Sequence, residues 1–484
     1  MSQPRTRYAI VGLGGRHYMF HEAILSTFAD HAELVALCDV NPGRVALSRR
    51  VAQLALTDRA QYQQVLKSMD AAGLTSAGDD ADLTVPGYGA DEFEKMIAET
   101  HPDTVIVTTK DATHDDYICR AMELGCDVIT EKPMTTDAVK ARRILDTQAR
   151  TGRKVTVTFN YRYSPPRTQI KDLLMSGVIG EVTSVDFHWL LDTHHGADYF
   201  RRWHRNKENS GGLMVHKATH HFDLVNWWLS DVPRRVYADG ARYFYRPETG
   251  DRYGLTARTD RCHTCPETNR CPFALKMADI PSLKALYLDS EQYDGYFRDR
   301  CVFSPEMNIE DNMTVVVDYA GGVKMSYSLT AFAPWEGYII SFNGTKGRIE
   351  HKMEEAAYIN GDGTVPGALK SEGTWIRVYP HWGAAREVEV WQAGGGHGGA
   401  DPIMLSYIFA PGAQEADPYL RAADQRAGAW SIGVGIAANA SMASGQAVDV
   451  AALLGAIDLP DYPVMPSGDE PLPLPVADGS AARV

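Results

Sequence analysis

The feature that most constrains the fold is a glycine-rich turn between a predicted strand and a predicted helix. Residues 6–11 (TRYAIV) are apolar and β-forming, and they end at Gly12. A helical pattern covers about 17–29, and residues 33–39 (ELVALCD) form a second predicted strand that ends in an acid. Strand, glycine-rich turn, helix and strand in this order predict a βαβ unit.

The turn itself has most of the spacing of a dinucleotide-binding motif. Gly12 permits the tight turn, and Gly14 lets the backbone approach a pyrophosphate at the helix N-terminus. His17 stands where the third glycine is expected. The candidate cofactor-binding residues of the turn are Gly12, Leu13, Gly14, Gly15, Arg16 and His17. The alternative interpretation is a purely structural turn, which the flanking strand and helix disfavour.

The acid at the end of the second strand indicates which dinucleotide binds. A carboxylate at Asp39 accepts hydrogen bonds from a ribose 2′-hydroxyl and repels a 2′-phosphate, so NAD is favoured over NADP. Arg44 (in DVNPGR) keeps NADP open, because a guanidinium can meet a phosphate or stack on adenine.

The alternation of strands and helices continues to about residue 160. Residues 104–109 (TVIVTT) form a continuous apolar strand, as expected when helices cover both faces of a sheet. A predicted helix at about 113–124 and strands at 126–130 and 154–162 follow. The pattern predicts a doubly wound parallel sheet, with an NAD-binding Rossmann domain over residues 1–153.

The pattern then changes to strands that are separated by turns. These runs predict an α+β domain at 154–458 with an open, mainly antiparallel sheet. Helices are predicted at about 164–176 and 214–229, and the tail (459–484), rich in Pro, Gly and Asp, is predicted to be a loose arm. An open sheet commonly pairs with another subunit, so a homodimer or homotetramer is expected. The strand-like runs are 181–191, 313–320, 323–332, 338–350 and 386–391.

Composition narrows the class of protein. The chain has 484 residues and a net charge of -14, which makes nucleic acid an unfavourable partner. The N-terminal segment lacks the apolar core of a signal peptide, and no apolar stretch is long enough to span a membrane. We therefore expect a globular cytoplasmic protein.

Residues 211–223 (GGLMVHKATHHFD) concentrate groups that can carry protons. On one continuous helix His216, His220 and Asp223 would share a face, and Lys217 and His221 would point about a hundred degrees away. One imidazole could then act as a base while Asp223 fixes its tautomer. A Zn or Fe site on the shared face is the first alternative, and an ordinary polar helix face is the second.

The segment TEKPMTTD (130–137) carries a resemblance to a known family. Together with six other segments, it resembles the glucose–fructose oxidoreductase / inositol dehydrogenase / MocA family. These segments are GLGGRH, VIVTTKDATH (105–114), GCDVITEKP (125–133), NYRYSPP (160–166), GVIGEV (177–182) and FNGTKGRIE (342–350). The resemblance covers roughly residues 6–450. It implies a Rossmann domain joined to an α/β domain with an open sheet.

The resemblance also implies roles for particular residues. The family's lysine in Glu-Lys-Pro sits beside the nicotinamide and helps to position or deprotonate a sugar hydroxyl, which implies Lys132 here. His220 and Asp223 match the family's second catalytic segment, whereas His216 stands where the family usually has Asp and Lys217 adds a cation. Residues implied around the nicotinamide are Thr109, His114, Glu131 and Arg162.

Further polar and aromatic groups near these motifs are candidates for a sugar pocket. Aromatic and arginine side chains serve both packing and ligand binding, so either use is open for each of them. The candidate substrate residues are Tyr161, His194, Trp203 and Arg205, with Tyr163 and His195 close by in the sequence.

Four cysteines gather within a predicted insertion at about 240–305. Cys262, Cys265 and Cys271 have C-x2-C-x5-C spacing, and Cys301 follows thirty residues later. Four thiolates can close a tetrahedral structural Zn site. A [4Fe–4S] cluster and free thiols are the alternatives, and His263 can replace one ligand.

These features favour an NAD-dependent oxidoreductase that oxidises a secondary hydroxyl of a sugar, polyol or glycoside, with Lys132 or His220 as the base. The first alternative is an NAD-dependent glycoside hydrolase that works by transient oxidation, elimination, hydration and re-reduction. The second is a non-catalytic NAD or sugar sensor.

Overall fold

The structure, a computed structural model, describes residues 4–68, 83–355, 369–394, 396–410, 412, 416–468 and 471–472. Its first domain holds a six-stranded sheet in the order β3-β2-β1-β4-β5-β6, and all neighbouring strands are parallel. This sheet confirms the predicted doubly wound fold. Its strand order reverses between β1 and β4, and ligands of such sheets bind at the carboxyl ends of the strands beside that point.

The elements of this domain follow the predicted alternation. The strand β4 is buried along its whole length because helices lie on both faces of the sheet. The strands are β1 (Thr6–Val11), β2 (Ala32–Asp39), β3 (Gly87–Gly89), β4 (Thr104–Val107), β5 (Asp127–Thr130) and β6 (Val155–Val157). The helices are α1 (His17–Glu22), α2 (Pro42–Thr57), α3 (Arg59–Ser68), α4 (Phe93–Thr100), α5 (His114–Glu123) and α6 (Ala138–Thr151).

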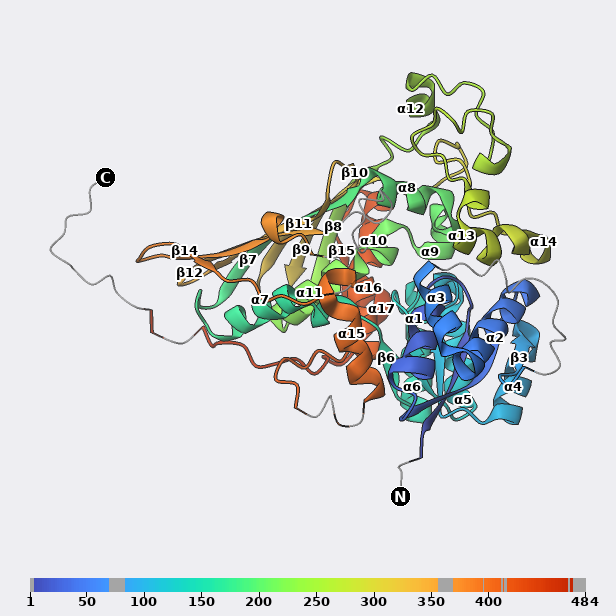
Figure 1. Cartoon of the computed structure of the whole chain (residues 1–484). Coiled ribbons are helices and arrows are strands. Elements are labelled where there is room, and N and C mark those ends of the chain that lie inside the picture. The colour runs from blue at the N-terminus through green and yellow to red at the C-terminus, as the bar shows by residue number, and fades with distance from the viewer. Residues whose placement is uncertain are drawn as a thin grey trace.

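The second domain is built on a nine-stranded sheet in the order β14-β13-β12-β11-β7-β10-β9-β8-β15. Only β7 and β10 run parallel, so the predicted mainly antiparallel sheet is confirmed. Buried and open positions alternate along β10, as expected for a sheet packed on one face. Helices lie along one side of this sheet (Figure 1), and α16 packs on β8.

The bounds of the second domain's elements are as follows. The strands are β7 (Val182–Asp192), β8 (Pro233–Ala241), β9 (Asn312–Tyr319), β10 (Lys324–Ala333), β11 (Glu336–Gly344), β12 (Gly347–Glu355), β13 (Trp375–Pro380), β14 (Arg386–Val388) and β15 (Val448–Asp449). The helices are α7 (Pro165–Met175), α8 (Thr193–Arg201), α9 (Lys207–Ser210), α10 (Leu213–His216), α11 (Thr219–Leu229), α15 (Gly396–Phe409), α16 (Gln425–Ser444) and α17 (Val450–Leu454).

Three sequence predictions need correction here. The helix predicted over 214–229 is two helices, because the chain leaves α10 after His216 and enters α11 at Thr219. The strand predicted over 154–162 ends at Val157, and a 3-10 helix covers Asn160–Tyr163. The run 338–350 belongs to a hairpin of two strands, β11 and β12.

The proline-rich tail is not a loose arm where the structure describes it. Ser230 Oγ donates a hydrogen bond to the Pro463 carbonyl at 2.6 Å, and Arg426 pairs with Asp461 at 2.8 Å. Residues 459–468 therefore pack against the second domain. The rest of the predicted arm, apart from 471–472, lies outside the described residues.

Residues 242–311 form a long insertion between β8 and β9. These two strands are antiparallel neighbours, and Ala241 pairs with Asn312 across their ends. A short turn would suffice to join them. The insertion instead carries α12 (Pro247–Arg252), α13 (Pro281–Leu286) and α14 (Glu291–Asp294), and it extends toward the first domain (Figure 1).

Candidate active site between the two domains

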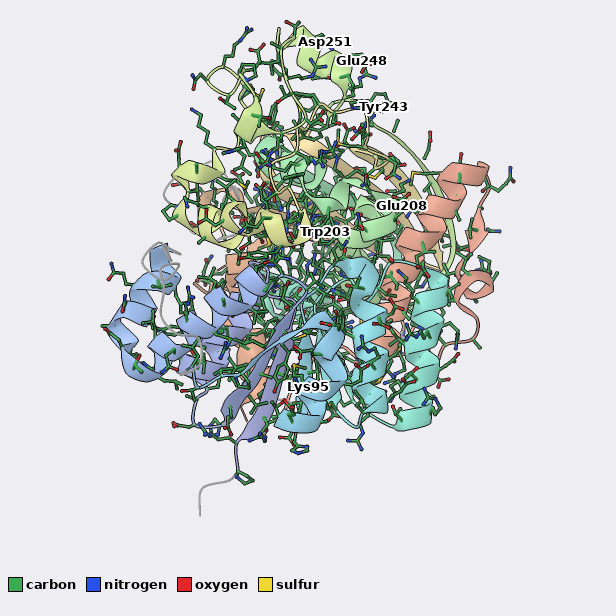
Figure 2. All side chains as sticks on the ribbon, turned by 90° about the vertical axis from the view of Figure 1, so that its right-hand side faces the viewer. Lys95, Trp203, Glu208, Tyr243, Glu248 and Asp251 are labelled. Carbon is green, nitrogen blue, oxygen red and sulfur yellow. The ribbon has the colours of Figure 1, made fainter. Side chains whose placement is uncertain are left out.

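A cavity of about 720 Å³ lies between the glycine-rich turn, the second domain and the insertion. Figure 2 shows Trp203 at this boundary, between the insertion and the parallel-sheet domain. The predicted residues that line the cavity are Gly12, Gly14, Gly15, Arg16, Asp39, Arg44, Thr109, His114, Glu131, Lys132, Tyr161, Trp203, His216, Lys217 and His220. The predicted residues that do not line it are Leu13, His17, Arg162, His194, Arg205 and Asp223.

The glycine-rich turn has the shape of a phosphate cradle. Gly12 has a φ of +91°, and a Cβ there would lie 2.5 Å from the backbone nitrogen of Thr109, so no other residue fits. A Cβ on Gly14 or Gly15 would meet nothing nearer than a tyrosine hydroxyl at 3.6 Å. The backbone at both positions is therefore open to the cavity, and the turn fits a pyrophosphate at the start of α1.

His17 does not contact the cavity, because its ring turns into the domain interior. Its Nδ1 lies 2.6 Å from the Gly14 carbonyl and its Nε2 lies 2.8 Å from Ser48 Oγ. A carbonyl can only accept, so the neutral ring donates from Nδ1 and accepts from Ser48. His17 thus stabilises the turn by linking the Gly14 carbonyl to Ser48 inside the domain. Leu13 is also buried, and only its backbone N–H acts here, by donating to Asp39 Oδ2 at 2.5 Å.

Arg44 is neutralised by two carboxylates. Its guanidinium pairs with Asp39 and also with Asp294, which comes from the insertion. Both carboxylates line the cavity beyond the end of β2. Arg44 is therefore engaged in ion pairs. No local pattern in the sequence predicts that Asp294 joins this group, because it lies 250 residues from Arg44.

Lys132 reaches the cavity from the loop after β5. Its Nζ lies 3.3 Å from the His216 carbonyl, and its backbone N–H lies 3.2 Å from Glu131 Oε2. The other carboxylate oxygen of Glu131 accepts from Arg16 at 2.6 Å. Burial lowers the pKa of Lys132 to about 8, although the neighbouring Asp111 carboxylate opposes this shift.

Asp111 was not predicted, and it is the partner of His216. Asp111 Oδ2 lies 2.5 Å from His216 Nδ1. Burial raises the pKa of Asp111 well above its usual range, and it lowers the pKa of His216 well below its own. The pair lies beside Lys132, so the cavity holds a second group that can give or take a proton.

Nearby loops hold the remaining predicted nicotinamide-end residues. The His114 ring lies between two backbone carbonyls. Its Nδ1 is 2.8 Å from the Pro133 carbonyl oxygen, and its Nε2 is 3.1 Å from the Thr109 carbonyl oxygen. It therefore ties the loop after β4 to the loop after β5. Thr109 Oγ1 accepts from Thr113 at 2.9 Å.

His220, Tyr161 and Lys217 form the opposite wall. The ring of His220 stacks on Tyr161 with centroids 4.2 Å apart, and Lys217 Nζ donates to Tyr161 Oη at 3.1 Å. The break after α10 turns His216, Lys217 and His220 all into the cavity. The prediction that Lys217 points away from the face of His216 and His220 is therefore wrong, because it assumed one continuous helix.

Asp223 does not orient an imidazole. Both of its carboxylate oxygens accept from Arg162, at 2.8 Å and 2.6 Å, and both side chains are 1% exposed. His220 Nδ1 is buried without a hydrogen-bond partner. The tautomer role predicted for Asp223 and the cofactor contact predicted for Arg162 are therefore corrected. The two residues form a buried structural ion pair instead. The alternative of a Zn or Fe site on His216, His220 and Asp223 also loses Asp223 as a ligand.

Of the predicted substrate residues, Tyr161 and Trp203 line the cavity, and Trp203 stacks on His204 with centroids 3.6 Å apart. His194 and Arg205 do not. His194 lies against Phe273 of the insertion. Burial, and after it the nearby charge of Arg300, lowers the pKa of Arg205 to about 10. His195, the neighbour of His194, lines the cavity in its place.

His195 belongs to a cluster with Asp192 and Glu336. Among the residues that the structure describes, it is the group of three possible metal ligands whose ligand atoms all lie within 4.8 Å of one another. His195 Nδ1 contacts Glu336 at 3.0 Å, and its Nε2 contacts Tyr199 at 3.1 Å. Both ring nitrogens thus have protein partners, so the cluster is a hydrogen-bonded wall of the cavity.

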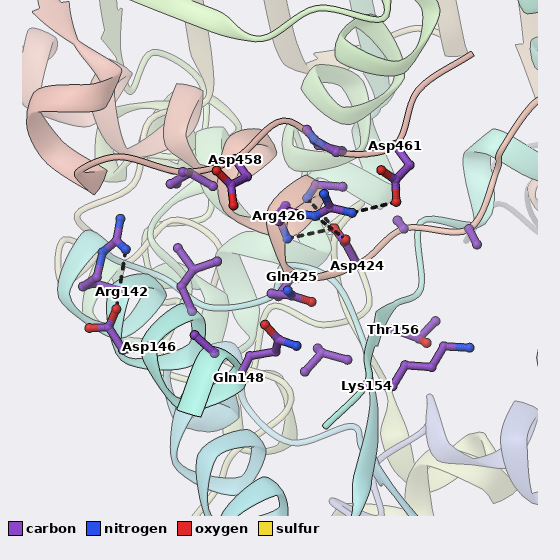
Figure 3. Close-up of a pocket in the computed structure, with 18 of the residues that line it drawn as sticks. Arg142, Asp146, Gln148, Lys154, Thr156, Asp424, Gln425, Arg426, Asp458 and Asp461 are labelled. Atoms are coloured by element: carbon purple, nitrogen blue, oxygen red, sulfur yellow. Dashed lines mark hydrogen bonds and ion pairs between the residues drawn. The ribbon is translucent and has the colours of Figure 1, made fainter. Parts of the chain in front are cut away.

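A second cavity, of about 610 Å³, lies between α6, the start of α16 and residues 456–461 (Figure 3). Its arginines are engaged in ion pairs, Arg142 with Asp146 and Arg426 with Asp424. Lysine, histidine and aspartate groups with shifted pKa values gather in the 720 Å³ cavity, which is therefore the candidate active site.

The four clustered cysteines line a small cavity of about 20 Å³ inside the insertion. That volume suits one water or one ion. No three of the four sulfurs, among the residues described, all lie within 4.8 Å of one another. Four thiolates on one zinc ion, each ~2.3 Å from it, would lie closer together than that.

The parallel sheet has a glycine cradle at its switch point, and the same cavity holds a lysine with a lowered pKa. Together these features characterise an oxidoreductase that uses a dinucleotide. The chain belongs to the Gfo/Idh/MocA oxidoreductase family. The family profile described as an NAD-binding Rossmann fold matches residues 6–159, and the one described as a C-terminal alpha/beta domain matches residues 171–450. The resemblance noted from TEKPMTTD is thereby confirmed.

Several relatives cover most or part of the chain. YteT of Bacillus subtilis (strain 168), named as an oxidoreductase, is 38% identical over 434 residues, which are 88% of this chain and 93% of YteT. The D-glucoside 3-dehydrogenase of Escherichia coli (strain K12) is 27% identical over 182 residues, 38% of this chain and 42% of that protein.

Solved structures share the fold. The WlbA dehydrogenase of Bordetella pertussis, solved with NADH and UDP-GlcNAcA, has a TM-score of 0.56 at 17% identity, covering 92% of this chain and 99% of that one. The aldose-aldose oxidoreductase of Caulobacter crescentus, solved with glycerol, has a TM-score of 0.55 at 16% identity, covering 92% and 100%. Among the helices that the structure describes, none has both the length and the hydrophobicity that a membrane span requires.

Proposed function

We propose that the protein is an NAD-dependent dehydrogenase that oxidises a secondary hydroxyl of a sugar, polyol or glycoside. The observation that carries this proposal is Lys132, a lysine with a pKa of about 8 in the same cavity as an open glycine cradle. The relative named as D-glucoside 3-dehydrogenase supports the substrate class.

The chain's residues divide into a cofactor side and a substrate side. NAD, when bound, supplies the hydride acceptor. Gly14, Gly15 and the start of α1 would hold the pyrophosphate, and Asp39 would bind the ribose. On the substrate side Trp203 offers an aromatic face to a sugar ring.

Lys132 is the proposed base. In its neutral form its Nζ accepts the proton of the substrate hydroxyl, and a pKa near 8 keeps neutral lysine accessible at physiological pH. The His216 carbonyl accepts a hydrogen bond from Nζ and holds it in place. His220 is the alternative base, since it lines the same cavity.

Redox-assisted glycoside hydrolysis is the second candidate, and the Asp111–His216 pair favours it. Oxidation of one hydroxyl needs one base, whereas this cavity holds a second proton-carrying pair beside Lys132. In the hydrolytic route the hydroxyl is oxidised, the neighbouring C–H loses a proton, the aglycone leaves, water adds, and the ketone is reduced again. NAD is needed and none is consumed.

A substrate screen separates these candidates. Purified protein with NAD is incubated with free sugars and polyols, and separately with p-nitrophenyl glycosides. Accumulation of NADH with free sugars supports the dehydrogenase, and release of p-nitrophenol that requires NAD but accumulates no NADH supports the hydrolase. NAD binding with no turnover of either class would instead indicate the non-catalytic sensor. Replacing NAD by NADP in the same screen tests cofactor choice.

We also propose that Cys262, Cys265, Cys271 and Cys301 hold a structural zinc ion. Binding would have to draw their sulfurs closer together around the 20 Å³ cavity. All seven cysteines are free thiols, which fits a cytoplasmic protein. Metal analysis of purified protein tests the site. One zinc per chain, lost in Cys271→Ser, supports it. Iron with visible absorbance would indicate a [4Fe–4S] cluster, and no metal would indicate free thiols.

The open face of the second sheet supports a homodimer or homotetramer. Tyr237 and Val316 are paired across β8 and β9, and both are about half exposed, at 48% and 49%. Their neighbours on the same face, such as Ser326 and Lys324 of β10, are polar, and open sheets of this kind commonly pair with another subunit. Light scattering tests this proposal. Val316→Lys should convert the oligomer to monomer, and a wild-type monomer at high concentration would contradict it.

A further inference from the structure

The insertion contacts the glycine-rich turn directly. Tyr287, just after α13, accepts a hydrogen bond at its hydroxyl from the Gly15 N–H at 3.1 Å. The same oxygen is the atom nearest to the positions where a Cβ on Gly14 or Gly15 would lie, at 3.6 Å. Because a phenol also donates, this hydroxyl can give a hydrogen bond to a phosphate oxygen held on the turn.

The insertion is also anchored along the outer edge of the first domain. Asp294 pairs with Arg44, and the Ser290 carbonyl accepts from Asn41 Nδ2 at 2.9 Å. A Cβ on Gly43 would lie 2.8 Å from Ser290 Oγ and 2.9 Å from the Tyr293 ring, so side chains of the insertion pack directly on Gly43. An apolar cluster backs these contacts, with Ala285, Leu286 and Tyr287 packed among Tyr18, Leu47 and Val51.

The other end of the insertion is fixed to the second domain. Arg298 makes two hydrogen bonds to Asp198 of α8, at 2.7 Å and 2.9 Å. Arg298 and Tyr296 line the cavity together with Tyr287 and Asp294. The insertion therefore crosses the cavity from one domain to the other, and it supplies one wall of the cavity along the way.

An internal ion pair connects this wall to the cysteine cluster. Arg261, next to Cys262, makes two hydrogen bonds to Glu291 of α14, at 2.7 Å and 2.6 Å. Arg261 also pairs with Asp299, whose carbonyl accepts from the Cys262 N–H at 2.9 Å. Through α14 the cysteine region thus holds Asp294 against Arg44.

We propose that residues 242–311 form a clasp that encloses the bound dinucleotide, with Tyr287 and Asp294 as its contacts at the nucleotide and the Arg261–Glu291 pair as its brace. This inference rests on the proposed function, in which the cavity binds NAD. A nucleotide held between the turn and the clasp leaves only when the insertion swings away. Loss of a clasp contact therefore speeds the release of the nucleotide.

The experiment measures release of NADH from the loaded full-length protein after mixing with excess NAD. Tyr287→Phe removes one hydroxyl and keeps the ring, and Glu291→Gln weakens the brace. Both should release NADH about fivefold to tenfold faster than wild type, as expected for one lost hydrogen bond or charged contact. Glu248→Gln is the matched control, because Glu248 lies far from the cavity on α12 (Figure 2), with its side chain 68% exposed.

The outcomes separate the clasp from the proposed function. Equal release rates for wild type, Tyr287→Phe and Glu291→Gln would overturn the clasp and leave NAD binding intact. Faster release in Glu248→Gln as well would also overturn it, because the effect would then be general to the insertion. A wild-type protein that binds no NADH would overturn the proposed function itself.

Discussion

Asp111 Oδ2 lies 2.5 Å from Nδ1 of His216, and this contact joins the loop after β4 to α10 across the domain boundary. The carbonyl of the same His216 accepts from Lys132 Nζ. Three proton-carrying groups from three elements therefore meet in one cavity. Their mutual charges decide at what pH Lys132 can act as a base.

The pH dependence of turnover follows from this arrangement. Burial lowers the pKa of Lys132 to about 8, and the Asp111 carboxylate opposes the shift. Lys132 must be neutral to accept a proton, so kcat/KM should rise as pH rises toward about 8. Asp111→Asn removes the opposing charge, lowers the pKa of Lys132 further and should move the rise to lower pH. An identical pH profile for the two proteins would contradict this assignment.

Cofactor choice should depend on a residue of the insertion. Arg44 is held by Asp39 and Asp294, so wild type should prefer NAD. The double variant Asp39→Ala/Asp294→Asn frees the guanidinium for a 2′-phosphate and should raise the ratio of kcat/KM for NADP over NAD by roughly tenfold or more. Asp289→Asn is the control, since Asp289 pairs with Lys284 on the surface. An unchanged ratio in the double variant would refute the role of this ion-pair group.

The Arg162–Asp223 pair should matter for stability rather than for the cofactor. Asp223→Asn leaves Arg162 charged and buried, which should lower the free energy of unfolding by about 3 kcal/mol in denaturant titrations. NAD affinity should stay near wild type, because neither residue lines the cavity. Glu123→Gln, which breaks an exposed pair with Arg150, should change stability by less than ~0.5 kcal/mol. Lost NAD binding in a stable Asp223→Asn protein would speak against the pair being structural.

His17 should make the fold sensitive to acid. Burial lowers its pKa from an ordinary 6.5 to about 4. The unfolded chain therefore takes up a proton first as pH falls from about 6.5 to about 4, and the free energy of unfolding falls over that window by on the order of 3 kcal/mol from this residue. His17→Gln should show a shallower decline in denaturant titrations at stepped pH. Parallel curves for the two proteins would mean that His17 is not buried neutral.

Local sequence signals were enough to predict where Gly12 and Asp39 lie in the fold, and both line the cavity. Gly12 and Asp39 are placed by the strand, turn and strand around them, which are contiguous in sequence and carry their own periodicity. Lys132 needed a different signal, the family's Glu-Lys-Pro motif, because an isolated lysine before a helix has no distinctive pattern.

Contacts between residues that lie far apart in the chain could not be predicted from the sequence. The partners Asp111 and His216 are 105 residues apart, and Tyr287 is 272 residues from Gly15. The helix break after His216 was also missed, because the apolar spacing continues across it and Lys217 and Ala218 carry no breaker signal. His216, Lys217 and His220 nevertheless line the cavity, whereas Asp223 pairs with Arg162.

The most direct test of the central claim replaces Lys132. Lys132→Ala should keep NAD affinity within about threefold while kcat falls by roughly a thousandfold on the substrate that the screen identifies. Lys110→Ala is the matched control, because Lys110 lines the same cavity but only contacts Asn209 at its edge, and it should retain turnover. Turnover near the wild-type rate in Lys132→Ala would contradict the assignment of Lys132 as the base.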